Sequence, residues 1–185
     1  MRLVLLRHTQ TAAGSSICYG DDDVDLADSH REDIANCVQT LPSVEHIITS
    51  PLTRCHDLAV SAATRLGVSL SIDHRLKEMH FGRWQGCAWD DVPRGELDEW
   101  VEDYECASPH GGETVSEFRV RVRELLTTVV TRFVGGGRIM LVTHAGVIRS
   151  ILALADPEQE GQRDERHFRI DYGQWLEVDY RGTEP

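Results

Sequence analysis

The chain has 185 residues, 41% hydrophobic and 27% charged, which is typical of one folded globular domain. Its formal net charge of −12 argues against nucleic acid or an anionic membrane as a partner, because both need a basic face. No apolar run approaches the roughly 20 residues needed to span a bilayer, and the apolar start before Arg7 is too short for a signal peptide. We therefore expect a cytoplasmic protein.

The first half of the chain alternates apolar runs with helical patterns. We expect a strand at 2–7, then a polar loop, then a helix opened by a capping box of Ser29 and Glu32. That helix should bury Ile34, Ala35, Val38 and Leu41. A second strand is predicted at 46–49. Ser50 and Pro51 suit the N-cap and first turn of a helix that ends at Gly67.

The second half begins with a short strand near 69–73. Residues 79–112, with three tryptophans and little periodicity, are interpreted as a small lid over the strand ends. A helix over 113–133 should bury Val115, Phe118, Val122, Leu125, Leu126 and Val129. Glycines 135–137 should end it before a third apolar strand, and a further helix is expected near 146–155. Apolar residues at 168–170 and 175–178 around Gly173 indicate a terminal antiparallel hairpin. The fold class is therefore α/β, a three-layer sandwich whose mainly parallel central sheet is flanked by helices.

Basic side chains stand where three of the predicted strands turn into helices. They are Arg7 and His8, Arg54, and His144. Ligands of α/β sheets bind at the carboxyl ends of the strands, where helix N-termini favour anions. Alone, each histidine is also compatible with a buried, backbone-bonded ring or a helix cap, and Arg54 with a surface salt bridge. Their joint occurrence predicts a phosphate site in which a neutral histidine can attack phosphorus.

In order along the chain, these junctions resemble the motifs of the histidine phosphatase superfamily, which includes cofactor-dependent phosphoglycerate mutase. The matching segments are Arg7-His8-Thr9, Ser50-Pro51-Leu52-Thr53-Arg54, Lys77-Glu78-Met79-His80-Phe81-Gly82-Arg83-Trp84-Gln85-Gly86, His110-Gly111-Gly112-Glu113-Thr114 and Thr143-His144-Ala145-Gly146. The resemblance covers almost the whole chain and implies one domain over 1–185.

The resemblance also implies roles for individual residues. His8 would be the nucleophile that becomes phosphorylated, and Glu78 the proton donor to the leaving alcohol and later the base for water. Arg7, Arg54 and His144 would hold the phosphoryl oxygens, with Thr11 and Ala145 as further substrate-binding residues. No metal or other cofactor is implied, because arginines supply the positive charge. Thr9, Gln10 and Gly14 depart from the usual glycine, glutamate and asparagine, which affects the finer substrate contacts.

A short insertion between Glu78 and His144 resembles the phosphatases more than the mutases, whose longer insertion carries basic residues for an acidic substrate. Residues 87–110 contain Arg94 and His110 as their only basic groups among many acidic ones. We therefore expect a poor fit for a doubly anionic phosphoglycerate. Within the phosphatases, the loop 11–25, the segment 78–84 and the tail 167–175 are most similar to the α-ribazole phosphatases of cobalamin synthesis. Trp84 and Trp89 are candidates for stacking on a benzimidazole-like base or for core packing.

Several alternatives remain open at this stage. The chain could be a histidine phosphatase of other or broad small-molecule specificity, or a non-catalytic domain that binds a phosphorylated ligand. A metallohydrolase is disfavoured because the nine histidines lack the paired spacings of metal sites. The five cysteines show no C-x-x-C spacing and suit incidental thiols better than a disulfide framework. The expected partner is a small phosphomonoester, and the sequence leaves the oligomeric state open, with a homodimer as one option.

Overall fold

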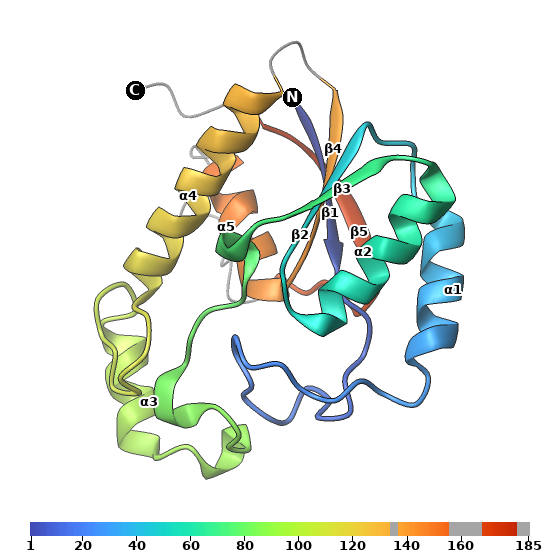
Figure 1. Cartoon of the computed structure of the whole chain (residues 1–185). Helices are drawn as coiled ribbons and strands as arrows, with labels where there is room; N and C mark the ends of the chain where they lie inside the picture. The colour runs from blue at the N-terminus through green and yellow to red at the C-terminus, as the bar shows by residue number, and fades with distance from the viewer. Residues whose placement is uncertain (134–136, 156–167, 181–185) are drawn as a thin grey trace.

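A computed structural model describes residues 1–133, 137–155 and 168–180 of the chain (Figure 1). A twisted five-stranded sheet runs through its centre, in the order β3-β2-β4-β1-β5. The strands are β1 (Arg2–Arg7), β2 (His46–Thr49), β3 (Ser69–Ile72), β4 (Arg138–Thr143) and β5 (Trp175–Asp179). β1, β2, β3 and β4 are mutually parallel, and β5 pairs antiparallel with β1. The predicted α/β fold with a mainly parallel sheet is confirmed.

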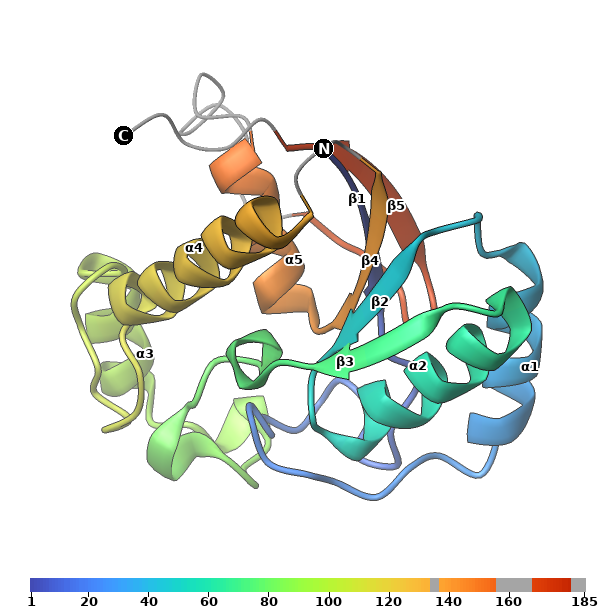
Figure 2. The ribbon, with the colours of Figure 1, turned by 45° about the horizontal axis from the view of Figure 1, so that its top comes forward.

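Helices cover both faces of this sheet, as Figures 1 and 2 show from two directions. α1 (His30–Thr40) and α2 (Thr53–Leu66) pack on one face, and α4 (Val115–Arg132) and α5 (Ala145–Ala155) on the other. The pleat of β1 divides its side chains between the two layers. Leu3 and Leu5 belong to the core under α4 and α5, whereas Val4 and Leu6 belong to the core under α1 and α2. All four are fully buried, which explains the unbroken apolar run in the sequence.

The helix boundaries follow the sequence prediction closely for α4 and less closely for α1. In α4 all six predicted core positions are buried, and Thr114 and Glu117 form a complete capping box. In α1 the expected capping box of Ser29 and Glu32 is absent, because the Ser29 hydroxyl donates to Asp33 instead. The predicted burial of Ala35 is also wrong, since Cys37 takes that place in the core and Ala35 is exposed.

α2 begins later than predicted. Leu52, not Ser50, stands at its N-cap, and no residue at that end provides a local side-chain cap. Asp23 of the N-terminal loop takes over this function, accepting from both the backbone N–H (3.0 Å) and the hydroxyl (2.6 Å) of Thr53. The helix ends as expected at Gly67, which adopts the left-handed conformation with φ of 68°.

The segment between β3 and α4, predicted as a lid at 79–112, contains α3 (Arg94–Glu102) and short 3-10 turns at Gly82–Trp84 and Trp89–Asp91. It lies below α4 in Figure 1, beyond the end of the sheet. A separate apolar cluster centred on Trp84 and Val92 holds it together and reaches Cys18 of the N-terminal loop. The segment and that loop therefore pack against each other.

The predicted terminal hairpin does not form, because β5 pairs with β1 and residues 168–171 are not a strand. A turn precedes β5, in which the Gln174 N–H donates to Asp171 O and Gly173 has a φ of 69°. The backbone before that turn is used elsewhere: Ile170 O accepts from Arg7, and the Gly173 N–H donates to His8 O. Of the predicted glycine stop at 135–137, residues 135 and 136 lie outside the described residues.

Within the described ranges, no helix is long and apolar enough to cross a membrane. The cytoplasmic location stays a prediction. Over the same ranges, no group of three or more histidine, cysteine or acidic side chains is arranged to hold a metal ion.

Candidate active site

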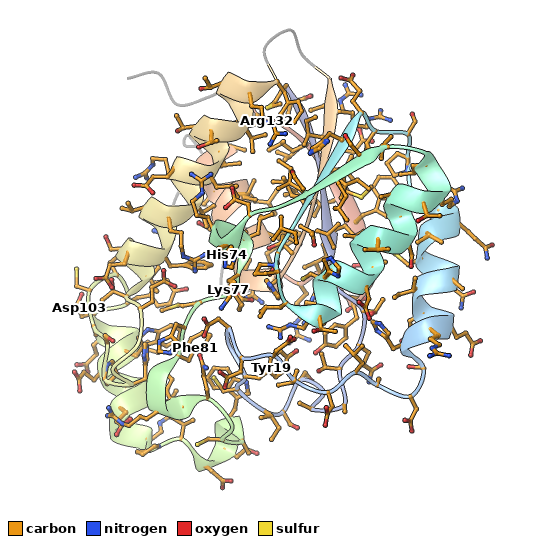
Figure 3. All side chains as sticks on the ribbon, in the orientation of Figure 1. Tyr19, His74, Lys77, Phe81, Asp103 and Arg132 are labelled. Atoms are coloured by element: carbon orange, nitrogen blue, oxygen red, sulfur yellow. The ribbon has the colours of Figure 1, made fainter. Side chains whose placement is uncertain are left out.

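The parallel sheet brings the predicted junctions together at one edge. Arg7 ends β1, and Arg7 pairs in register with Thr143, which ends β4 just before His144. Ser50 follows β2, and its N–H donates to Val142 O of β4 (3.0 Å). A cavity of about 360 Å³ opens at this edge, lined by Arg7, His8, Glu78, His144, Ala145 and Gly146. Tyr19 and Phe81, labelled in Figure 3, line it from the N-terminal loop and the lid segment.

His8 is buried in the floor of this cavity with a defined tautomer. Its Nδ1 lies 2.7 Å from Thr9 O, and because a carbonyl only accepts, Nδ1 must carry the proton. The lone pair is therefore on Nε2. Burial holds the pKa of His8 well below 6.5, and the charges of Arg54 and Arg7 lower it further against the opposing hydrogen bond to Thr9. The ring is neutral near pH 7, as a nitrogen nucleophile requires.

His144 is the second buried histidine and lies beside the first, with ring centroids 5.2 Å apart. Arg54 Nε donates to its Nδ1 (3.4 Å), so the proton is on Nε2, which lies 3.0 Å from Ser50 Oγ. Burial and the neighbouring charge of Arg54 hold the pKa of His144 well below its usual value. Ser50, predicted as a helix cap, thus orients this ring instead.

Arg7 and Arg54 supply positive charge without a carboxylate partner in the described part of the chain. Arg54 is fully buried and donates to Asp22 O (2.6 Å) and Gly20 O (2.7 Å). Arg7 donates to Ile170 O (2.6 Å) and lies 3.9 Å from the centre of the Tyr172 ring. Because hydrogen bonds to carbonyls leave the charges uncompensated, this end of an otherwise acidic protein attracts an anion. Arg7 lines the cavity, whereas Arg54 lies behind it against His144 and the loop.

Glu78 lines the same cavity as the two histidines. Its Oε2 accepts from the Gly146 N–H (2.9 Å), and its Oε1 accepts from the Met79 N–H (3.1 Å). Gly146 is the last residue of the Thr-His-Ala-Gly motif, and a Cβ there would collide with the Glu78 carboxylate. The motif therefore brings His144 and Glu78 into one site by leaving room for the carboxylate.

The N-terminal loop places the remaining predicted residues around this centre. Thr9, which replaces the usual glycine, is buried with its hydroxyl 2.9 Å from His30 Nδ1, and His30 Nε2 lies 3.5 Å from Asp57. Thr11 is buried too, but it does not line the cavity, and its hydroxyl has no hydrogen-bond partner among the described residues. Ala145 does line the cavity.

Sequence reasoning missed Tyr19 and Tyr172, which also line the cavity. The Tyr172 ring is tilted against the His8 ring, with ring centroids 5.4 Å apart, and its hydroxyl lies 3.2 Å from that of Tyr19. Burial and that hydrogen bond raise the pKa of Tyr172 to about 12, so it stays protonated. Tyr172 occurs in the tail that resembles the α-ribazole phosphatases, but no local pattern indicates that this tail returns to the first strand.

Aromatic side chains of the lid segment form the outer wall of the cavity. Phe81, Trp89, Trp100 and Tyr104 line it, whereas Trp84 is 1% exposed and donates its Nε1 to Glu96 (2.7 Å) inside the segment. Of the two tryptophans proposed for stacking, Trp89 therefore lines the cavity and Trp84 belongs to the core.

Besides Arg7, two further arginines line the cavity, and both lie outside residues 87–110. Arg119 of α4 and Arg149 of α5 line it. Arg119 is paired with Glu105 (2.6 Å), and Arg149 Nε donates to Phe168 O (3.1 Å). The basic residues between 87 and 110 do not include these two, because both belong to helices that follow the lid segment in the chain.

A family model described as the histidine phosphatase superfamily, branch 1, matches residues 3–185. The chain belongs to the histidine phosphatase superfamily. A glucosyl-3-phosphoglycerate phosphatase of Mycolicibacterium vanbaalenii is 36% identical over 165 residues, which cover 82% of this chain and 72% of that protein. This superfamily membership and its relatives named as phosphatases identify the chain as a phosphatase.

Solved structures of the superfamily are similar to the whole fold. A putative α-ribazole-5′-P phosphatase from Escherichia coli superposes with a TM-score of 0.83 at 27% identity, covering 96% of this chain and 89% of that one. A mycobacterial glucosyl-3-phosphoglycerate phosphatase in complex with VO3 has a TM-score of 0.81 at 28% identity, covering 96% and 90%. Phosphatases with two different named substrates thus share this architecture.

Proposed function

We propose that this phosphatase hydrolyses a small-molecule phosphomonoester through a phosphohistidine at His8. The supporting observation is the neutral His8 ring with its lone pair on Nε2, close to Arg7 and Arg54, neither of which has a carboxylate partner among the described residues. Nε2 attacks phosphorus, the ester P–O bond breaks, and Glu78 protonates the departing alcohol oxygen. Water then attacks the phosphohistidine while Glu78 takes its proton, which releases inorganic phosphate and free His8.

Each neighbour of His8 has a separate task in this scheme. Arg7, Arg54 and His144 stabilise the negative charge of the transferring phosphoryl group. Thr11 and Ala145 are carried over as substrate-binding positions, and of these Ala145 lines the cavity. Glu78 lines the same cavity, where two backbone N–H groups hold its carboxylate. No step requires a metal ion, because the arginines provide the charge.

We propose α-ribazole 5′-phosphate, an intermediate of cobalamin nucleotide-loop assembly, as the substrate. The aromatic wall of Phe81, Trp89, Trp100 and Tyr104 favours a flat base, since aromatic side chains stack on such rings. The similarity in fold to a putative α-ribazole-5′-P phosphatase supports the same substrate.

A second candidate is glucosyl-3-phosphoglycerate. Arg119 and Arg149 favour this substrate, because guanidinium groups bind carboxylates and this leaving group carries one. The sequence similarity to phosphatases named for this compound supports it as well. Its sugar ring would lie against the same aromatic wall.

A steady-state comparison of kcat/KM for both compounds, with sugar phosphates and an aryl phosphate as references, tests the proposal. Release of phosphate from none of them by wild type, with no phosphoenzyme, would make the chain a non-catalytic binding domain. Arg149→Gln separates the two candidates, because it should weaken turnover of the acidic substrate selectively. A higher wild-type kcat/KM for the α-ribazole compound, with a value that Arg149→Gln leaves unchanged, supports the first assignment.

A further inference from the structure

One arginine of α4 forms hydrogen bonds with the backbone around Glu78. Arg121 donates through Nη1 to Arg75 O (2.7 Å) and to Lys77 O (3.0 Å), and through Nη2 to Glu78 O (3.3 Å). Arg75 belongs to the short 3-10 turn His74–Leu76, whereas Lys77 and Glu78 belong to the stretch 77–81, which has no helix or strand. Since buried backbone groups need partners, the guanidinium supplies what regular secondary structure would otherwise provide.

Glu113 binds Arg121 and also contacts the backbone on the C-terminal side of Glu78. Its carboxylate accepts two bonds from Arg121, from Nε (2.9 Å) and from Nη2 (2.8 Å). The Glu113 backbone N–H donates to His80 O (2.8 Å), and Glu113 Oε2 lies 3.4 Å from the His80 N–H. The pair therefore fixes the main chain on both sides of Glu78. Neither residue lines the active-site cavity, so neither is placed to touch the substrate.

We propose that Arg121, held by Glu113, is a positioning residue that sets the place of the Glu78 carboxylate. This inference rests on the proposed function, because it assumes that Glu78 is the acid for the leaving group. A proton donor must lie within hydrogen-bond reach of the leaving oxygen, and an error of about 1 Å costs on the order of 10²-fold in rate. Five donor–acceptor contacts of one planar guanidinium are a geometry that a lysine ammonium cannot reproduce.

The experiment uses Arg121→Lys, which keeps the positive charge and removes the planar guanidinium with its several N–H donors. Formation of the phosphoenzyme is followed in single turnovers with an alkyl phosphate and with an activated aryl phosphate. The alkyl reaction should slow by about tenfold or more, because its poor leaving group needs the acid, while the aryl reaction should change by less than about threefold. Arg65→Lys is the matched control, since Arg65 of α2 lies on the other face of the sheet, donates to Gln39 O (3.1 Å) and should leave both rates unchanged.

Combination with Glu78→Gln decides whether Arg121 acts through Glu78. In the Glu78→Gln background, Arg121→Lys should produce no further loss with the alkyl phosphate, because the group it positions is gone. Equal losses with both phosphates, or losses that multiply in the double variant, would overturn the inference. If Glu78→Gln itself shows no dependence on the leaving group, the assignment of the acid fails instead. Should Arg121→Lys not fold, Glu113→Gln removes the negative charge that binds Arg121 and is tested by the same comparisons.

Discussion

Gly146→Ala should displace the proposed acid without disturbing the fold. A Cβ built on Gly146 would lie 3.0 Å from Glu78 Cδ and 3.2 Å from Oε2, and closer still to Oε1, well inside van der Waals contact. The obstacle is the end of a flexible side chain, so the carboxylate moves rather than the helix. Alanine also favours a helical backbone over glycine by about 0.5–1 kcal/mol, so the variant should unfold at the same or a higher temperature than wild type.

The size of the effect follows from that geometry. Restoring an ordinary contact requires the carboxylate to move by about 1 Å, a misplacement that costs on the order of 10²-fold. The move also breaks the 2.9 Å bond from the Gly146 N–H to Oε2. Single-turnover phosphorylation by an alkyl phosphate should therefore slow about 10²-fold, while an activated aryl phosphate, which departs without protonation, should react within about threefold of wild type.

Gly95→Ala is the matched control for this experiment. Gly95 is the second residue of α3, as Gly146 is of α5, and a Cβ there would meet nothing within 4 Å. It should leave both reactions unchanged. If Gly146→Ala slows both phosphates equally, or leaves alkyl phosphate turnover at the wild-type level, Glu78 is not an acid that depends on this geometry.

Three further outcomes are expected. His8→Ala should abolish turnover with the fold intact, and wild type quenched with labelled substrate should hold an acid-labile, base-stable label on His8; a label on another residue would refute the nucleophile. Hydrolysis of an aryl phosphate should survive excess EDTA, whereas a loss restored by a divalent metal would contradict an arginine-based site. Because the pKa values of His8 and His144 are lowered on folding, the unfolded chain binds more protons below about pH 6.5. The free energy of unfolding should therefore decrease as the pH is lowered below that value, by up to about 1.4 kcal/mol per pH unit for each histidine. The unfolding temperature of His144→Gln should decrease less steeply over the same pH range.

The strands and α4 could be predicted because local pattern and tertiary environment agree there. Leu3 to Leu6 are buried on both faces of the sheet, and an unbroken apolar run is the direct result. The parallel order then places every strand's carboxyl end at one edge, so Arg7, His8 and His144 could be expected to meet before any coordinates were known.

The failures concern backbone groups whose partners are distant in sequence. Ser50 has the right chemistry for a cap, but its hydroxyl is directed to His144, 94 positions away, and Asp23 caps the helix from a loop. The tail has the alternation of a hairpin, but Arg7 and His8 bind its first part. In both cases a contact with the candidate site outweighs the local preference, which is helix capping for Ser50 and hairpin formation for the tail. Prediction from local sequence is expected to fail at such sites.

The charge around the leaving group illustrates the same limit most clearly. The lid segment is acidic, and read alone it predicts a site that repels a carboxylate. Arg119 and Arg149 stand on α4 and α5, which pack against each other over the sheet and bring two guanidinium groups to the cavity that the lid aromatics also line. Under the proposed function, the flat part of the substrate is therefore selected by the lid and its charge by the helices. The two properties reside on different elements, so Arg149→Gln can alter the preference for acidic leaving groups while the aromatic wall remains intact.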